Sequence, residues 1–158
     1  MPHARFRLVV ALYGVLRDAD WVLLLRRAGS GYRDGQLSLP AGHLDGNEDV
    51  VAGLVRELRE ELTIDADRDS CRLVLVMHRP PESSDDHEYL DLFFTVGAWA
   101  GTPAIGEPDK CGELVWAGIR TPPADTVDYV RAALGEIVEG KRTLLPYGWS
   151  APPGEQPA

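Results

Sequence analysis

The stretch of sequence that decides the fold is LPAGHLDGNEDVVAGLVRELREELTI, which runs from Leu39 to Ile64. Its second half carries apolar residues at every fourth position, and this period predicts an amphipathic helix over residues 48–63. The apolar stripe consists of Val50, Leu54, Leu58 and Leu62, and it is widened by Val51 and Val55.

The residues before this helix predict a glycine-containing loop over 41–47, which follows a short strand at 37–39. Asp45 and Glu48 have the spacing of a capping box, and Asn47 is a competing N-cap. A loop of this kind exposes backbone groups that can approach a phosphate or a metal ion closely.

The helix carries a cluster of carboxylates beside its apolar stripe. Glu57, Glu60 and Glu61 are related by three and four positions, so they share one helix face. Like charges at this spacing destabilise a helix by roughly 0.2–0.5 kcal/mol per pair, so a cation should balance them. Arg56 and Arg59 are internal candidates, and a hard divalent cation is the alternative. A purely solvated helix face is the competing interpretation.

Loop and helix together resemble the Nudix box. In that pattern a glycine is followed after five residues by a glutamate, and after seven more by Arg-Glu-aliphatic-any-Glu-Glu-any-Gly-aliphatic. Here Gly42 and Glu48 precede the segment RELREELTI at residues 56–64, and the matching spacing extends over 23 residues. The one departure is Thr63, which stands where the pattern has a glycine that favours a left-handed helix end.

The resemblance implies hydrolysis of a nucleoside diphosphate linked to another group, with Mg²⁺ as cofactor and Mn²⁺ as a substitute. Carried over by position, Glu60 and Glu61 are expected to be metal ligands, and Glu57 a ligand or the general base. Arg56 is expected to hold a glutamate by a bidentate bond. Glu48 is expected to orient either Arg56 or a metal-bound water.

Further site residues are expected outside the helix. The backbone carbonyl of Ala41 is a candidate metal ligand, and Gly42 is a candidate for contact with the substrate. Many Nudix enzymes add a carboxylate from outside the box. Glu113 is the first candidate, because it begins a strand at 113–117 that could lie across the sheet from the helix. Glu107 is the second candidate. The competing interpretation is that each is a surface glutamate.

The substrate is specified less well. Residues 106–111 (GEPDKC), followed by Trp116, resemble a segment of MutT-like nucleoside triphosphate pyrophosphatases, which favours cleavage of a (deoxy)nucleoside triphosphate to monophosphate and pyrophosphate. Pro80 lies sixteen residues beyond Ile64, near a position associated with ADP-ribose pyrophosphatases in this superfamily. ADP-ribose or a nucleotide sugar is therefore the alternative substrate.

Several residues are candidates for substrate binding. Tyr32 lies on a loop before the box and is suited to stack on a base. Arg26 and Arg27 close a strand near the glycine loop and would supply local positive charge. His78 and Arg79 end another strand and could reach phosphates, although a hydrogen-bonded structural role competes for the histidine.

The remaining chain predicts strands and one more helix, which together give an α/β (α+β) class with a mixed β-sheet sandwiched between α-helices. The expected strands cover 5–16, 21–27, 71–78, 89–99 and 113–117, and the second helix covers 125–138. A single domain is expected over residues 1–145, followed by an irregular C-terminal tail over 146–158.

The formal net charge of −9 disfavours nucleic acid polymers and anionic membranes as partners. A small nucleotide is the expected partner, and its site needs local cations. Dimers are common in the superfamily that the chain resembles, so a homodimer is open, although no residue pattern identifies an interface.

A cytoplasmic location is expected. Cys71 and Cys111 form no CxxC pair and no disulfide framework. The apolar run at residues 8–16 has the outline of a signal peptide. However, Arg17 and Asp18 stand where a small-residue cleavage site should be, so a buried strand is favoured.

Two other classes of function compete with catalysis. One is a non-catalytic Nudix module that binds a nucleotide as a sensor, which has no need of all three box glutamates. The other is a structural helix whose acidic face resembles a box by chance. Magnesium would stabilise an enzyme by linkage and leave a structural helix unchanged.

Overall fold

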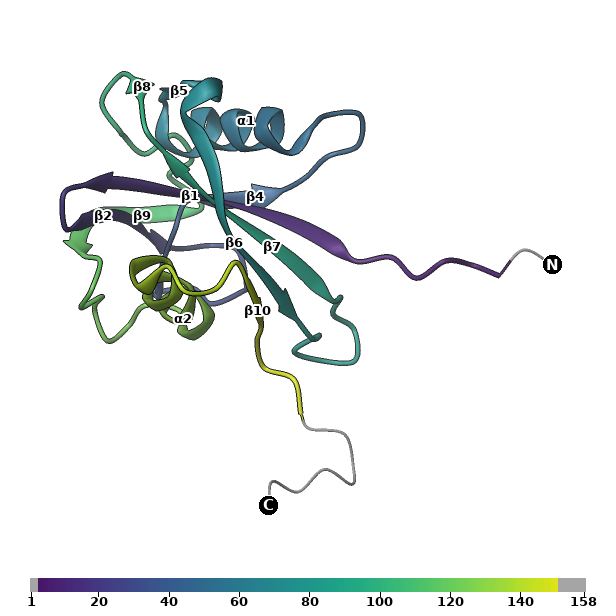
Figure 1. Ribbon diagram of the computed structural model, residues 1–158. Coiled ribbons are helices and arrows are strands. Elements are labelled where there is room, and N and C mark those ends of the chain that lie inside the picture. Colours follow the sequence, from purple (N-terminus) through teal and green to yellow (C-terminus); the bar gives the residue numbers. More distant parts are fainter. Residues whose placement is uncertain (1–2, 151–158) are drawn as a thin grey trace.

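The computed structural model describes residues 3–150. Its elements are β1 (Val9–Asp18), β2 (Trp21–Arg27), β3 (Leu37–Ser38), β4 (Ala41–His43), α1 (Val50–Leu62), β5 (Asp65–Ala66), a 3₁₀ turn (Arg68–Ser70), β6 (Cys71–Arg79), β7 (Tyr89–Val96), β8 (Trp99–Ala100), β9 (Cys111–Gly118), α2 (Asp128–Glu139) and β10 (Leu144–Pro146). The main sheet has the order β10-β6-β7-β1-β2-β3, with β4 added to β1 and β9 added to β2. Helix α1 lies above this sheet and α2 below it (Figure 1), which confirms the predicted class.

Strand β1 is the centre of the fold. It pairs with β7 in parallel over eight residue pairs and with β4 in antiparallel over three. Its pairing with β2 is confined to Arg17↔Val22 and Asp18↔Trp21, at the turn. The two strands therefore diverge from the turn, and β2 continues with β3 and β9 as partners. This divergence opens the sheet next to β4.

Both faces of β1 are buried, which explains its nearly unbroken apolar sequence. Leu12 and Leu16 pack with Leu54 and Leu58 under α1. The alternate positions, among them Tyr13 and Val15, pack with α2 on the other face. Within residues 3–150, neither helix is long and apolar enough to cross a lipid bilayer.

The ends of α1 differ in detail from the expected caps. Asp49 is the N-cap, because its carboxylate accepts hydrogen bonds from the N–H groups of Val51 and Ala52. Of the two bonds of the expected capping box, one is present among the described residues: the Asp45 N–H donates to Glu48 Oε1. Thr63 adopts the left-handed conformation (φ 57°) that favours glycine, so the helix ends with the geometry of the box pattern.

Several strand predictions need correction. Residues 41–43, expected as loop, form β4 because β1 offers an open edge there. The strand expected over 89–99 divides at Gly97, and Trp99 begins β8, which pairs with β5. Both changes follow from pairing between distant segments, which local sequence does not specify.

The irregular tail begins later than expected. Residues 144–146 form β10, which runs parallel to β6, and the Tyr147 N–H donates to the His78 carbonyl. The indole N–H of Trp149 donates to the same carbonyl. Residues 147–150 have no regular secondary structure, as expected for the tail, and only Pro146 differs because it ends β10. Residues 151–158 lie outside the described range.

Candidate functional site

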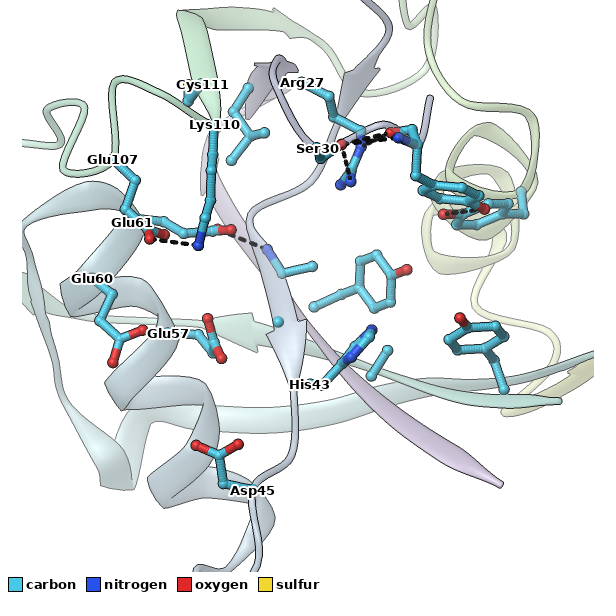
Figure 2. A pocket seen from close by; sticks show the side chains of 18 of the residues that line it. Arg27, Ser30, His43, Asp45, Glu57, Glu60, Glu61, Glu107, Lys110 and Cys111 are labelled. Atoms are coloured by element: carbon cyan, nitrogen blue, oxygen red, sulfur yellow. Dashed lines mark hydrogen bonds and ion pairs between the residues drawn. The ribbon is translucent and has the colours of Figure 1, made fainter. Parts of the chain in front are cut away.

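A pocket of ≈ 550 Å³ opens where β1 and β2 diverge. The α1 glutamates lie on one side of the pocket and aromatic rings on the other (Figure 2). The acidic end is lined by Asp45, Glu57, Glu60, Glu61, Glu107 and Lys110. The far end is lined by Tyr13, Tyr32, Arg79, Tyr89 and Tyr129.

Strand β4 presents its backbone to the acidic end. The Gly14 N–H donates to the Pro40 carbonyl and the Leu44 N–H to the Val10 carbonyl. Because hydrogen-bonded and non-hydrogen-bonded pairs alternate in an antiparallel ladder, the N–H and C=O of Ala41 point away from β1. The Ala41 N–H donates to Glu61 Oε2 at 2.9 Å, so the carbonyl of the same residue faces this outer edge.

Gly42 is needed because the Glu57 carboxylate lies directly against its Cα. A Cβ at this position would overlap the carboxylate carbon and both oxygens of Glu57. The box glycine and the first glutamate of the acidic cluster are therefore linked by packing. This contact holds the Glu57 carboxylate against the backbone of β4.

Arg56 organises the carboxylates from one side. Its Nε and Nη2 donate to the two carboxylate oxygens of Glu48, at 3.1 and 2.7 Å, and its Nη1 donates to Glu57 at 2.7 Å. Nη2 also reaches the His43 carbonyl at 3.2 Å. The bidentate partner of Arg56 is thus Glu48, which lies outside the pocket lining, and the arginine fixes the orientation of Glu57.

The acidic cluster holds more negative charge than its surroundings neutralise. Burial, together with the neighbouring carboxylates of Glu57 and Glu107, raises the pKa of Glu61 to about 8, against the opposing effect of the hydrogen bond from the Ala41 N–H. Burial also raises the pKa of Glu57, although Arg56 opposes this shift. A cation in the pocket would lower both values and stabilise the ionised forms.

The two candidates for an additional carboxylate lie in different places. Glu107 lines the pocket and receives a 2.9 Å ion pair from Lys110. Its loop is held against the end of α1, because the Gly106 N–H donates to the Glu61 carbonyl.

Glu113, the first candidate, is outside the pocket. It pairs across the sheet with Arg26 on β2, at 2.8 Å, and its side chain is 52% exposed. The loop before β9, and not the strand itself, approaches α1. This placement reverses the expected order of the two glutamates.

The substrate-binding candidates divide in the same way. Tyr32 and Gly42 line the pocket. Arg26 does not line the pocket, because its guanidinium forms ion pairs with Glu113 and Asp125. His78 contacts Glu88 at 3.1 Å and also lies outside the lining. Arg27, next to Arg26 in the sequence, does line the pocket, because neighbouring positions on a strand face opposite sides.

Arg79 is the prominent residue of the far end. It ends β6 and forms a buried ion pair with Asp91 on β7, whose side chain is fully buried. The sequence signals were an arginine at the end of an apolar strand and an aspartate within one. Neither signal says that the two residues meet, because the register of β6 and β7 decides this.

The donor set at the acidic end suits a hard divalent cation, since every candidate ligand is an oxygen. These donors are the carboxylates of Glu57, Glu60, Glu61 and Glu107 and the carbonyl of Ala41. Among residues 3–150, no three acidic, histidine or cysteine side chains already converge at ligand distances. The carboxylates are thus gathered but separate, as expected for like charges.

Comparisons with known proteins agree with this architecture. The NUDIX domain model matches residues 5–134. The structure of a MutT NUDIX hydrolase from Burkholderia pseudomallei is similar with a TM-score of 0.72 and 25% identity, covering 80% of this chain and 95% of the other. A search of curated proteins gave no match.

Two further structures share the fold at lower identity. A NUDIX hydrolase from Nitrosomonas europaea has a TM-score of 0.71 at 23% identity, with 86% of this chain and 92% of the other covered. A bifunctional NMN adenylyltransferase/ADP ribose pyrophosphatase from Francisella tularensis, complexed with AMP and a Mn ion, has a TM-score of 0.67 at 18% identity, with 86% and 43% covered.

Proposed function

Because the chain belongs to the Nudix hydrolase family and is a pyrophosphohydrolase, we propose that it cleaves a (deoxy)nucleoside triphosphate to a monophosphate and pyrophosphate with Mg²⁺. Mn²⁺ is the proposed substitute. The observation that carries this proposal is the division of a single pocket into an acidic end and a tyrosine-lined end.

The two ends of the pocket match the two ends of a nucleotide. Phosphates need cations, and the glutamates of α1 would hold a divalent metal ion that supplies this positive charge. A base needs flat apolar contacts, which Tyr32, Tyr89 and Tyr129 offer. The box glutamates lie next to β4, and Arg79 lies three strands away on β6. This separation is roughly 14 Å at the usual spacing of paired strands, a length suited to a nucleotide.

The proposed ligands of the metal ion are Glu60, Glu61 and the Ala41 carbonyl, and Glu57 is either a further ligand or the general base. Bound Mg²⁺ supplies charge neutralisation on the phosphate oxygens and activation of water. Arg56 holds Glu57 in place, and Glu48 in turn fixes Arg56. Ala41 orients Glu61 through its N–H.

In the reaction, a water oxygen forms a bond to one phosphorus and the phosphoanhydride bond to the leaving pyrophosphate breaks. The proton of the water passes to a carboxylate of the pocket, Glu57 or Glu107. Arg27 and Lys110 line the same pocket and offset charge on the phosphates.

The test is a chromatographic assay with Mg²⁺ and a panel of nucleoside triphosphates, ADP-ribose, dinucleoside polyphosphates and nucleotide sugars. Cleavage of a triphosphate to monophosphate plus pyrophosphate is the expected result. Preferential cleavage of ADP-ribose would overturn the proposed substrate. Metal binding without any cleavage would favour a nucleotide sensor.

A further inference from the structure

Arg79 is held in one orientation at the tyrosine end of the pocket. Its Nε and Nη2 donate to the two carboxylate oxygens of Asp91, and the two side chains are 5% and 0% exposed. The Arg79 guanidinium carbon also lies 3.7 Å from the ring centroid of Tyr129 and 4.8 Å from that of Tyr89. A guanidinium fixed by two bonds and two rings has little freedom to rotate.

The third nitrogen of this guanidinium is available to a ligand. Nη1 makes no hydrogen bond to any residue between 3 and 150, and it is not among the buried polar atoms that lack a partner. It is therefore the part of Arg79 that reaches the pocket. The nearest acidic oxygen is Glu82 Oε1, at 3.9 Å.

Glu82 is also positioned by its neighbours. Its Oε1 accepts hydrogen bonds from Arg33 at 2.7 Å and from the Tyr32 hydroxyl at 3.0 Å. Among the described residues, Oε2 has no hydrogen-bond partner. Glu82 lines a smaller pocket of ≈ 380 Å³ that shares Arg79 and Tyr129 with the main pocket. The Arg79 donor and the Glu82 carboxylate thus lie 3.9 Å apart, and both residues line the smaller pocket, so a ligand edge that contacts both has to extend from the main pocket into the smaller one.

A donor beside an acceptor is complementary to a lactam, in which a carbonyl oxygen adjoins a ring N–H. Guanine, hypoxanthine, uracil and thymine carry this edge. Adenine and cytosine carry the reverse order, an amino donor beside a ring-nitrogen acceptor. With the reverse order, the amino donor of the base would face the donor Nη1, and the ring-nitrogen acceptor would face the carboxylate acceptor, so neither hydrogen bond could form.

We propose that Arg79 and Glu82 select nucleotides whose base carries a lactam edge, and that Asp91 positions Arg79 for this contact. The inference rests on the proposed function, because it assumes that the base occupies the tyrosine end. It extends that function by excluding adenine nucleotides, ADP-ribose among them, as preferred substrates.

The experiment measures equilibrium binding of GMP, IMP, UMP, AMP and CMP by calorimetry, because monophosphates contain no phosphoanhydride bond to be cleaved. The wild-type protein should bind GMP at least about 10-fold more tightly than AMP, and UMP at least about 10-fold more tightly than CMP. Equal binding within each pair would overturn the proposal. If triphosphates are still cleaved in that case, the proposed function stands without it.

The variants assign the preference to the two residues. Arg79→Met combined with Asp91→Asn removes both buried charges, and should bring GMP and AMP within about 2-fold of each other. Glu82→Ala alters an exposed loop and should reduce the preference even if the double variant fails to fold. Arg72→Met, on the same strand but outside both pockets, should retain it. An undiminished preference in Glu82→Ala, or in a folded double variant, would contradict the assignment.

Discussion

The two ends of the pocket are stabilised in opposite ways. At the acidic end, carboxylates are crowded on one helix face, and burial raises the pKa values of Glu57 and Glu61. At the tyrosine end, the charge of Arg79 is matched by Asp91 and covered by two rings. The first arrangement would be completed by the divalent cation proposed above. The second is complete without a ligand and is suited to recognise one rigidly.

The largest expected effect comes from the acidic end. Glu61→Gln keeps the shape of the side chain but removes a metal ligand, and should lower kcat by roughly 10³-fold, the equivalent of several kcal/mol of charge stabilisation. Steady-state kinetics on the cleaved nucleotide measure it. Glu139→Gln, at the exposed end of α2, is the control and should have wild-type activity. Full activity in Glu61→Gln would refute the proposed metal site.

The tyrosine end should respond in stability. Asp91→Asn leaves the Arg79 charge buried without its partner, so the free energy of unfolding should fall by roughly 3–5 kcal/mol. Urea denaturation measures this loss. The double variant with Arg79→Met should recover most of it, because it removes the unpaired charge. Equal losses in both variants would mean that packing, and not charge, holds this end.

The ionisation of Glu61 at the acidic end should make the stability of the protein depend on pH. The pKa of Glu61 in the folded protein is about 8, above its ordinary value, so its ionisation opposes folding. In the presence of a chelator, this contribution to stability is fully present below the ordinary pKa of 4.5 and is lost as the pH rises through 8. The loss at pH 9 should be roughly 3 kcal/mol relative to pH 6. Glu61→Gln should lack this component in parallel urea titrations, and an identical pH profile would contradict the shift.

The smallest effects on kcat are expected at Glu107 and Glu113, the two candidates for an additional carboxylate. Glu107→Gln should lower kcat roughly 10²-fold, because it removes a candidate proton acceptor from the pocket. Glu113→Gln should leave kcat within about 2-fold and cost less than about 1 kcal/mol of stability, since its ion pair with Arg26 is largely exposed. Kinetics and urea denaturation of the matched pair measure both. A larger loss of kcat in Glu113→Gln than in Glu107→Gln would mean that Glu113 on β9, and not Glu107, is the additional carboxylate of the site.

The sequence by itself determined the acidic end of the pocket. The grouping of Glu57, Glu60 and Glu61 follows from helical geometry within five residues, and of the loop expected over 41–47 only the part after β4 is irregular. The fold class also followed, because alternation and periodicity report which faces are buried. Thr63 shows the limit of this reasoning, since the chain there adopts the left-handed turn without the glycine that usually marks it.

Only the tertiary structure decided which distant residues complete the site. Whether Glu107 or Glu113 reaches α1 depends on how the loop before β9 closes against the end of the helix. Whether Arg79 meets Asp91 depends on the register between β6 and β7, in which a shift of one residue would turn the side chain to the other face. The strand at 144–146 likewise needed an open edge on β6. Contacts within one helix are set by local geometry, whereas contacts between strands are set by packing of the whole sheet.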